Sequence, residues 1–110
     1  MSNYERILEF DVDGQRIIKK RDCDFSNIVS GTIGYLKAKF YFSQSDWESC
    51  TKVVSFWSED KENAVLLDEN NMCTIPNEAL TSEQFKVSVI GQKSGYRITT
   101  NKTKVKQEVR

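Results

Sequence analysis

The sequence predicts an all-β protein, in which two antiparallel sheets pack face to face as a sandwich. Three observations lead to this prediction. Apolar and polar residues alternate in several runs with a period of two, as in strands that have one buried face. These runs recur at intervals of about eight to twelve residues, and turn residues rather than helical segments separate them. The chain has 110 residues, enough for one hydrophobic core, so we expect a single domain over residues 1–110.

The N-terminal part predicts a hairpin. Residues 7–12 alternate apolar and charged side chains, and Asp13-Gly14 follows directly. This dipeptide suits a type I′ turn, whose two central residues need positive φ, so residues 15–18 should return antiparallel. Residues 19–24 form a charged connector, which could alternatively be a patch for phosphate or an acidic partner. Asp22 and Asp24 lack a third carboxylate or a suitable glycine loop, so we expect a solvated turn there rather than a divalent ion.

The centre of the chain carries the clearest strand pattern. Residues 25–35 are an irregular link with two glycines, and Leu36, Ala38 and Phe40 then fall on one parity while lysines fall on the other. After a short polar break, residues 51–57 are again β-branched and aromatic, so the two runs should be neighbouring or facing strands. Trp47 should close one end of the core, with its indole N–H bonded to a carbonyl. The predicted core comprises Leu36, Phe40, Phe42, Trp47, Val54, Phe56, Phe85, Val87 and Val89.

The C-terminal half predicts the remaining strands. Residues 58–63 read as a charged turn, 64–67 as a short strand, 68–71 as a tight turn and 72–75 as the return strand of a second hairpin, which Pro76 ends. One helical turn near 77–83 is the only helical signal. Residues 85–91 alternate strictly, 93–95 form a turn and 96–100 the next strand. Residues 102–109 should be an edge strand, on which lysines discourage unwanted pairing.

Composition disfavours several classes of function. The 16 basic and 16 acidic residues balance, so the chain has no basic footprint for general nucleic-acid binding. It contains no histidine, and its three cysteines lack the spacing of a zinc site or a disulfide framework, so we expect reduced thiols, with Cys73 in the core. We therefore expect no enzyme, metal or cofactor. No apolar run is long enough to span a bilayer, and no signal peptide core follows the start, which predicts a protein made in a cytoplasm without membrane attachment.

Six segments, read in order, resemble a family of small immunoglobulin-like domains. They are DGQ at 13–15, IGYLKAKFYFS at 33–43, Trp47 with Thr51-Lys52 and Phe56 behind it, VLLDENNMCTIPNEAL at 65–80, FKVSVIG at 85–91 and RITTN at 97–101. The family is encoded among the tail and baseplate genes of bacteriophages of Gram-positive hosts. The pattern is similar to the N-terminal domain of phage baseplate upper proteins. This chain departs from it at Ser49 and Cys50, where members often have Gly and Leu.

The resemblance implies an immunoglobulin-like β-sandwich of about eight short strands. It also implies a non-enzymatic, virion-associated adaptor of a phage tail, baseplate or fibre, made in the cytoplasm of the bacterial host, with other phage structural proteins as partners. Many relatives continue into a coiled coil or a fibre, whereas this chain stops at Arg110. We therefore expect an adaptor or decoration domain rather than the rod of a fibre.

Three aromatic residues are candidates for partner contact: Tyr41, Trp57 and Tyr96. Exposed aromatic side chains are typical anchors of interfaces, and an edge strand at either terminus could add to the sheet of a partner or of a second copy. Trp57 could instead be simply a second-sheet or rim residue, since scattered aromatic residues on a surface often have no partner. Two other functions remain open, namely a small phage-encoded inhibitor of a host defence protein, and a carbohydrate-binding module in which one of these rings stacks on a sugar of the host wall.

Overall fold

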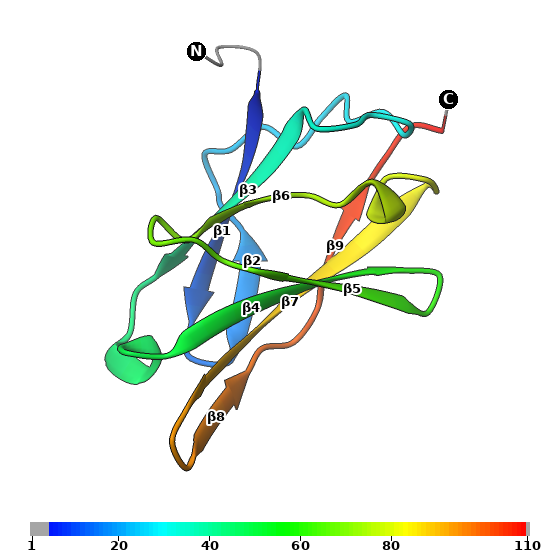
Figure 1. Cartoon of the computed structure of the whole chain (residues 1–110). Helices are drawn as coiled ribbons and strands as arrows, with labels where there is room; N and C mark the ends of the chain where they lie inside the picture. Colours follow the sequence, from blue (N-terminus) through cyan, green and yellow to red (C-terminus); the bar gives the residue numbers. More distant parts are fainter. Residues whose placement is uncertain (1–4, 110) are drawn as a thin grey trace.

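The computed structural model describes residues 5–109, which form nine strands and two 3₁₀ turns, and the predicted all-β sandwich is confirmed (Figure 1). The strands are β1 (Arg6–Asp13), β2 (Arg16–Lys19), β3 (Leu36–Phe42), β4 (Thr51–Ser58), β5 (Lys61–Leu66), β6 (Met72–Thr74), β7 (Gln84–Lys93), β8 (Tyr96–Thr99) and β9 (Thr103–Lys106). The 3₁₀ turns are η1 (Ser45–Trp47) and η2 (Asn77–Ala79). The one short helical turn predicted near 77–83 is present as η2.

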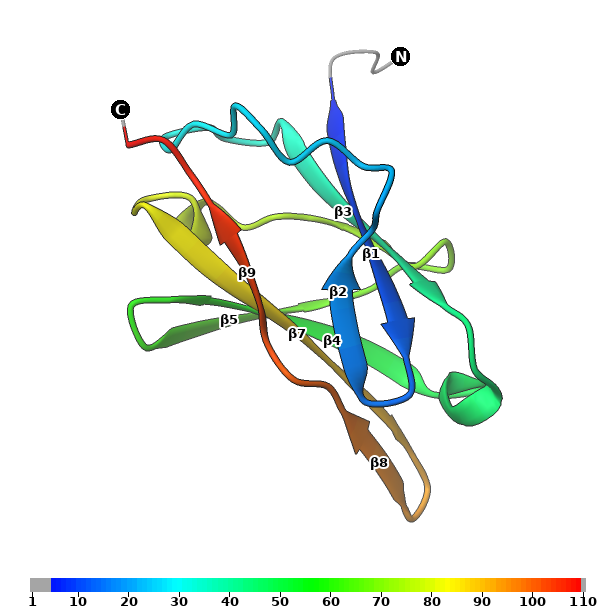
Figure 2. The same ribbon diagram turned by 180° about the vertical axis from the view of Figure 1, so that it is seen from behind.

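The strands form two facing sheets (Figures 1 and 2). The first has the order β2-β1-β3-β6. In the second, β5, β4 and β7 are neighbours, and β8 and β9 follow each other along the far side of β7. The strand pairings are antiparallel except between β1 and β3, which are parallel from Arg6 opposite Leu36 to Val12 opposite Phe42. The long link between β2 and β3 makes this parallel pairing possible, because it returns the chain to the end where β1 begins.

Side chains from both sheets fill the space between them. Phe10 and Phe40 stack on the first sheet with their ring centroids 5.1 Å apart, and Phe56 and Phe85 meet edge to face on the second at 6.1 Å. The central runs 36–42 and 51–57 are therefore facing strands. Of the predicted core, all but one residue are buried, namely Leu36, Phe40, Trp47, Val54, Phe56, Phe85, Val87 and Val89. Phe42 is half-buried and packs on Trp47 at 5.0 Å.

Trp47 closes one end of the sandwich. Its side chain is 1% exposed, and its indole Nε1 donates a hydrogen bond of 2.9 Å to the carbonyl of Gly14, as the sequence predicted. The ring also lies on the backbone of Gly91, where a Cβ atom would stand 2.7 Å from two ring carbons. Just after it, Ser49 has a φ of 64°, a left-handed conformation that suits the glycine often found there in the resembling family.

The structure corrects three local predictions. The first turn uses Gly14-Gln15 rather than Asp13-Gly14, because Asp13 pairs with Arg16 and only Gly14 has a positive φ, of 60°. That arrangement is typical of a type II′ turn. The second turn is only Glu59-Asp60, with φ values of 49° and 70°, so β5 begins three residues earlier than the predicted strand at 64–67.

The third correction changes the topology. Residues 72–75 were expected to pair with 64–67, but β6 pairs with β3 in the other sheet, where Cys73 lies opposite Ala38. Residues 67–71 therefore cross from one sheet to the other. Asp68 shapes this crossing, because its carboxylate accepts hydrogen bonds from the backbone N–H groups of Asn70 and Met72. As a result, β5 has a neighbouring strand on one side only among residues 5–109.

Candidate functional site

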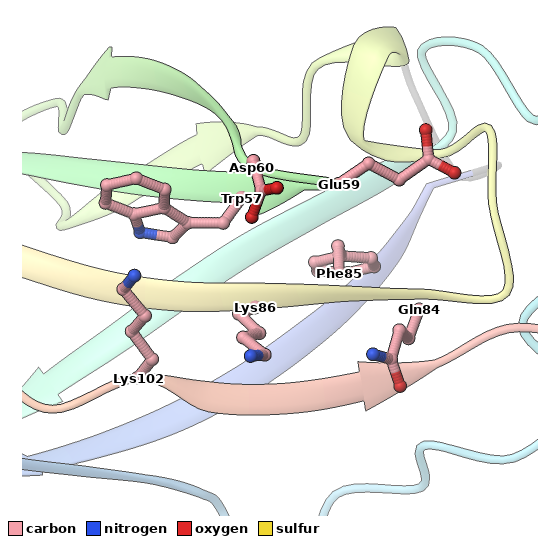
Figure 3. Close-up of a pocket in the computed structure, with 7 residues that line it drawn as sticks. All are labelled: Trp57, Glu59, Asp60, Gln84, Phe85, Lys86 and Lys102. Carbon is pink, nitrogen blue, oxygen red and sulfur yellow. The ribbon is translucent and has the colours of Figure 1, made fainter.

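Trp57 lies on the outer face of the second sheet, on the parity opposite to the buried Phe56. Its neighbours across the sheet are Glu62 on β5 and Lys86 on β7. Trp57 is half-buried, and its indole Nε1 donates a hydrogen bond of 3.0 Å to the hydroxyl of Ser88. The ammonium of Lys102 stands 3.8 Å from the ring centroid, within cation–π range (Figure 3). Trp57 is thus held in one orientation by contacts within the chain.

A shallow hollow of about 200 Å³ opens beside this tryptophan (Figure 3). Glu59 and Asp60 from the β4–β5 turn line one side, and Gln84, Lys86 and Lys102 line the other. One aromatic ring surrounded by donors and acceptors is a composition that suits contact with a sugar or a polar peptide. However, Lys102 already occupies a face of the indole, so a stacked sugar ring on that face would have to displace the ammonium.

Tyr41 lies on the outer face of the first sheet, far from Trp57. Its hydroxyl donates a hydrogen bond of 2.5 Å to the carboxylate of Glu9, and this bond raises the pKa of Tyr41. The ammonium groups of Lys20 and Lys39 stand 4.8 Å and 5.2 Å from the ring centroid. Tyr41 is thus surrounded by side chains of its own sheet.

Tyr96 opens strand β8 and ties that strand to the end of the sandwich near Trp47. Its hydroxyl donates a hydrogen bond of 2.7 Å to the carbonyl of Asp46 in η1, and Lys93 lies 4.7 Å from its ring centroid. Burial of the ring raises its pKa, with a further contribution from the nearby Asp46 carboxylate. The three candidate contact residues therefore lie in three separate places, and the fold does not bring them together into one site.

A different surface feature was missed by the sequence reasoning. Leu66, at the end of β5, is 64% exposed, although it belongs to a regular strand. A groove of about 540 Å³ lies next to it, between β5 and β6, and Val65, Met72 and Cys73 contribute to its lining. The two-residue turn at Glu59-Asp60 is the signal that could have indicated this edge, because the position of the turn determines where β5 begins.

The cysteines and acidic residues of the described part of the chain are not gathered into a metal site. Among residues 5–109, no group of three or more His, Cys, Asp or Glu side chains lies close enough together to bind an ion. Cys23, Cys50 and Cys73 are free thiols. Burial raises the pKa of the Cys73 thiol to about 12, which keeps it protonated and a poor nucleophile at neutral pH. In the same part of the chain, no helix is long and apolar enough to cross a membrane.

The fold and these surfaces define a small two-sheet β-sandwich whose aromatic surface residues are fixed by neighbouring lysines, hydroxyls and carbonyls. Among solved structures, this sandwich is similar to the N-terminal domain of phage TP901-1 ORF48, with a TM-score of 0.52 and 8% sequence identity. The similarity covers 94% of this chain and 98% of the phage domain. No protein-family model and no curated protein matches the sequence. The resemblance to phage proteins is thus supported at the level of the fold, which this chain shares with a phage domain over nearly its whole length.

Proposed function

We propose that this chain is a non-enzymatic structural module of a bacteriophage, which docks onto a larger assembly of the tail, baseplate or fibre. The observation that carries the proposal is the end-to-end match of its fold to a phage domain. The six sequence segments that resemble phage baseplate domains support it independently, since they are distributed along the same length of chain.

The chemistry of the surface favours docking over catalysis. The side chains that sequence reasoning singled out as contact residues are held by hydrogen bonds and by lysines, as at Trp57 and Tyr41. Rigid aromatic side chains lose little conformational entropy when a partner covers them. The stacking of a wall polysaccharide has less support, because Lys102 already covers a face of the Trp57 ring.

Mass spectrometry of purified virions tests the proposal. We expect the chain to sediment with gradient-purified particles at a constant ratio to the other structural proteins. A chain that is absent from particles but co-purifies with one host protein from infected lysate would instead be an inhibitor, and that result would overturn the proposal.

A further inference from the structure

We propose that the free edge of β5 is the docking edge of this domain, and that it takes up an extended, aliphatic segment with basic flanks from another protein as an added strand. This inference rests on the proposed function, since it names the surface and the class of partner through which such a module would dock.

Within the part of the chain that the structure describes, the backbone of β5 offers unpaired hydrogen-bonding groups on one side. The two-residue turn makes Ser58 and Lys61 a hydrogen-bonded pair, and alternate residues along an antiparallel ladder then point the same way. The N–H of Leu67 continues this ladder, since it donates to the carbonyl of Lys52 at 3.0 Å. The N–H and C=O groups of Glu62, Ala64 and Leu66 therefore point away from β4, out of the sheet edge.

Hydrogen bonds already occupy the edges of β2 and β8, because they join β2 and the turn before it to β8 and the residues just after it. The N–H of Ile17 donates to the side-chain oxygen of Asn101 at 2.9 Å, and the N–H of Asn101 donates to the carbonyl of Gln15 at 3.0 Å. The amide of Gln15 in turn donates to the carbonyl of Thr99 at 3.2 Å. A strand that added to either edge would have to break these bonds.

The other two edges carry common protections against pairing. Strand β6 is only three residues long, and Pro76 follows it within two residues. Strand β9 presents the exposed Lys104 and Lys106. Short strands, prolines and lysines all discourage the addition of another strand. By contrast, β5 has six residues, no proline, and an uncharged stretch from Asn63 to Leu66.

The charges around β5 specify the flanks of the added segment. Glu59, Asp60 and Glu62 lie at the start of the strand, with one exposed cation, Lys61, among them, so this end keeps an acidic excess. Asp68 and Glu69 lie just beyond the other end of the strand. Within residues 5–109, no ion pair joins any of these five carboxylates to a lysine or an arginine. Glu62 accepts a hydrogen bond from the hydroxyl of Ser55, and Asp68 accepts two from backbone N–H groups, so both keep their negative charge without a cationic partner. An incoming strand with an aliphatic centre and a basic residue at each end would match this pattern, with one set of side chains near Leu66 and the other toward the groove beside Val65.

The same charges disfavour a second copy of β5 as the occupant. If two copies of β5 paired antiparallel about a two-fold axis, the residues whose backbone groups point outward would lie opposite each other. Depending on the register, Glu62 of one copy would then lie opposite Leu66, Ala64, Asp68 or Glu62 of the other copy. None of these registers gives Glu62 a basic partner, and two of them place carboxylates directly opposite each other, which is destabilising. A basic segment from another protein avoids this repulsion.

Binding of synthetic peptides tests the proposal directly. The probe is fluorescein-labelled KRVTVTVKR, and the matched control is EEVTVTVEE, which has the same centre and acidic flanks. We expect the basic peptide to bind at least about tenfold more tightly, with affinity that falls as salt rises. Amide hydrogen exchange in the complex should slow at Glu62, Ala64 and Leu66. Slowed exchange at another edge instead, or no binding up to about 1 mM peptide, would overturn the proposal.

Two substitutions distinguish the loss of strand pairing at the β5 edge from the loss of the fold. Ala64→Pro removes an outward N–H that β4 does not use, so it should abolish binding with little change in unfolding midpoint. Ala64→Lys keeps the N–H but places a lysine on this exposed strand position, and it should weaken binding at least about tenfold; it carries the test if the proline variant does not fold. If both folded variants bind as tightly as the parent chain, the proposal is wrong.

Self-association is measured in the same samples by sedimentation. The proposal expects a monomer without peptide, whereas a dimer or polymer that Ala64→Pro dissolves would identify a second copy as the occupant and overturn it. These results are independent of the virion experiment. Peptide binding at β5 can fail while the chain is found in particles, and the chain can be absent from particles while the edge still binds the peptide.

Discussion

At the scale of single residues, the contact between Trp47 and Gly91 shows how one large side chain dictates its neighbour. Gly91 lies in a regular part of β7, where its φ does not call for glycine. The reason for glycine is steric, because an added Cβ would stand 2.7 Å from Cε3 and Cζ3 of Trp47. A ring that is 1% exposed and hydrogen-bonded to Gly14 cannot move aside easily.

We therefore predict that Gly91→Ala lowers the free energy of unfolding by about 1–3 kcal/mol, the usual cost of overpacking a core. The same substitution in a Trp47→Leu background should cost much less, because the smaller side chain leaves room for the methyl group. Urea denaturation of the four proteins in this double-mutant cycle measures the difference. Equal costs in both backgrounds would show that the ring is not what excludes a side chain at residue 91.

The buried thiol of Cys73 predicts a dependence of stability on pH. Burial, with a smaller contribution from the Asp68 carboxylate, raises its pKa from 9.0 to about 12. The folded state keeps the thiol proton to a higher pH than the unfolded state does. The contribution of the neutral thiol to the free energy of unfolding is therefore complete below pH 9, and it is lost as the pH rises from 9 to about 12. In that window, we expect a loss of up to about 1.4 kcal/mol per pH unit.

Denaturation of the reduced protein from about pH 8 to about pH 11 checks this slope. Cys73→Ala is the matched control, since it removes the thiol but keeps a small apolar side chain. Its stability should fall less steeply above pH 9 than that of the parent chain. Parallel curves for the two proteins would contradict the assigned pKa.

At the scale of elements, the β4–β5 turn is made of residues that do not favour its conformation. Glu59 and Asp60 have φ values of 49° and 70°, in a region where Gly and Asn are preferred. We predict that Asp60→Gly raises the free energy of unfolding by about 0.5–1 kcal/mol, after allowing for the extra freedom of glycine in the unfolded chain. Ala64→Gly, in extended backbone of the same hairpin, should lower it by a similar amount. Thermal or urea unfolding compares the two, and a destabilised Asp60→Gly would mean that the turn has another conformation.

This turn also explains where sequence reasoning failed. Alternation located β1, β3, β4 and β7, because each has one face in the core. Gly14 and Gly95 also mark the turns that follow β1 and β7. The acidic pair Glu59-Asp60 contains no glycine that would mark the turn, so the predicted strand begins later in the sequence than β5 does. Alternation also cannot specify which strand lies beside which, and β6 was therefore assigned to β5 rather than to β3.

The candidate site was predicted only in part, for a related reason. The parity of Trp57 within residues 51–57 correctly placed it on an outer face. Its contact with Lys102 joins segments that are distant in the sequence, and such contacts follow from the arrangement of β4, β7 and β9 rather than from any local pattern. The free edge of β5 was not predicted, because the expected hairpin would have paired residues 72–75 with this strand.

At the scale of the whole molecule, the two sheets depend on each other for burial. Phe10 and Phe40 on one sheet, and Phe56 and Phe85 on the other, belong to the same core cluster and are at most 1% exposed. Neither sheet could cover these rings alone, because its inner face would be open to water. The two sheets should therefore unfold together, in one cooperative transition.

The two tryptophans allow this prediction to be tested at two places in one molecule. Trp57→Phe leaves Trp47 as a fluorescent probe of the core at the end of the sandwich, and Trp47→Phe leaves Trp57 as a probe of the outer face of the second sheet. Within each variant, the midpoint from tryptophan fluorescence should coincide with the midpoint from far-UV circular dichroism. The Trp47 variant should melt earlier, since it loses the bond to Gly14 and part of the core packing. If Trp57 instead reported a separate transition, the second sheet would keep its structure without the first, and the edge of β5 would belong to an independent folding unit.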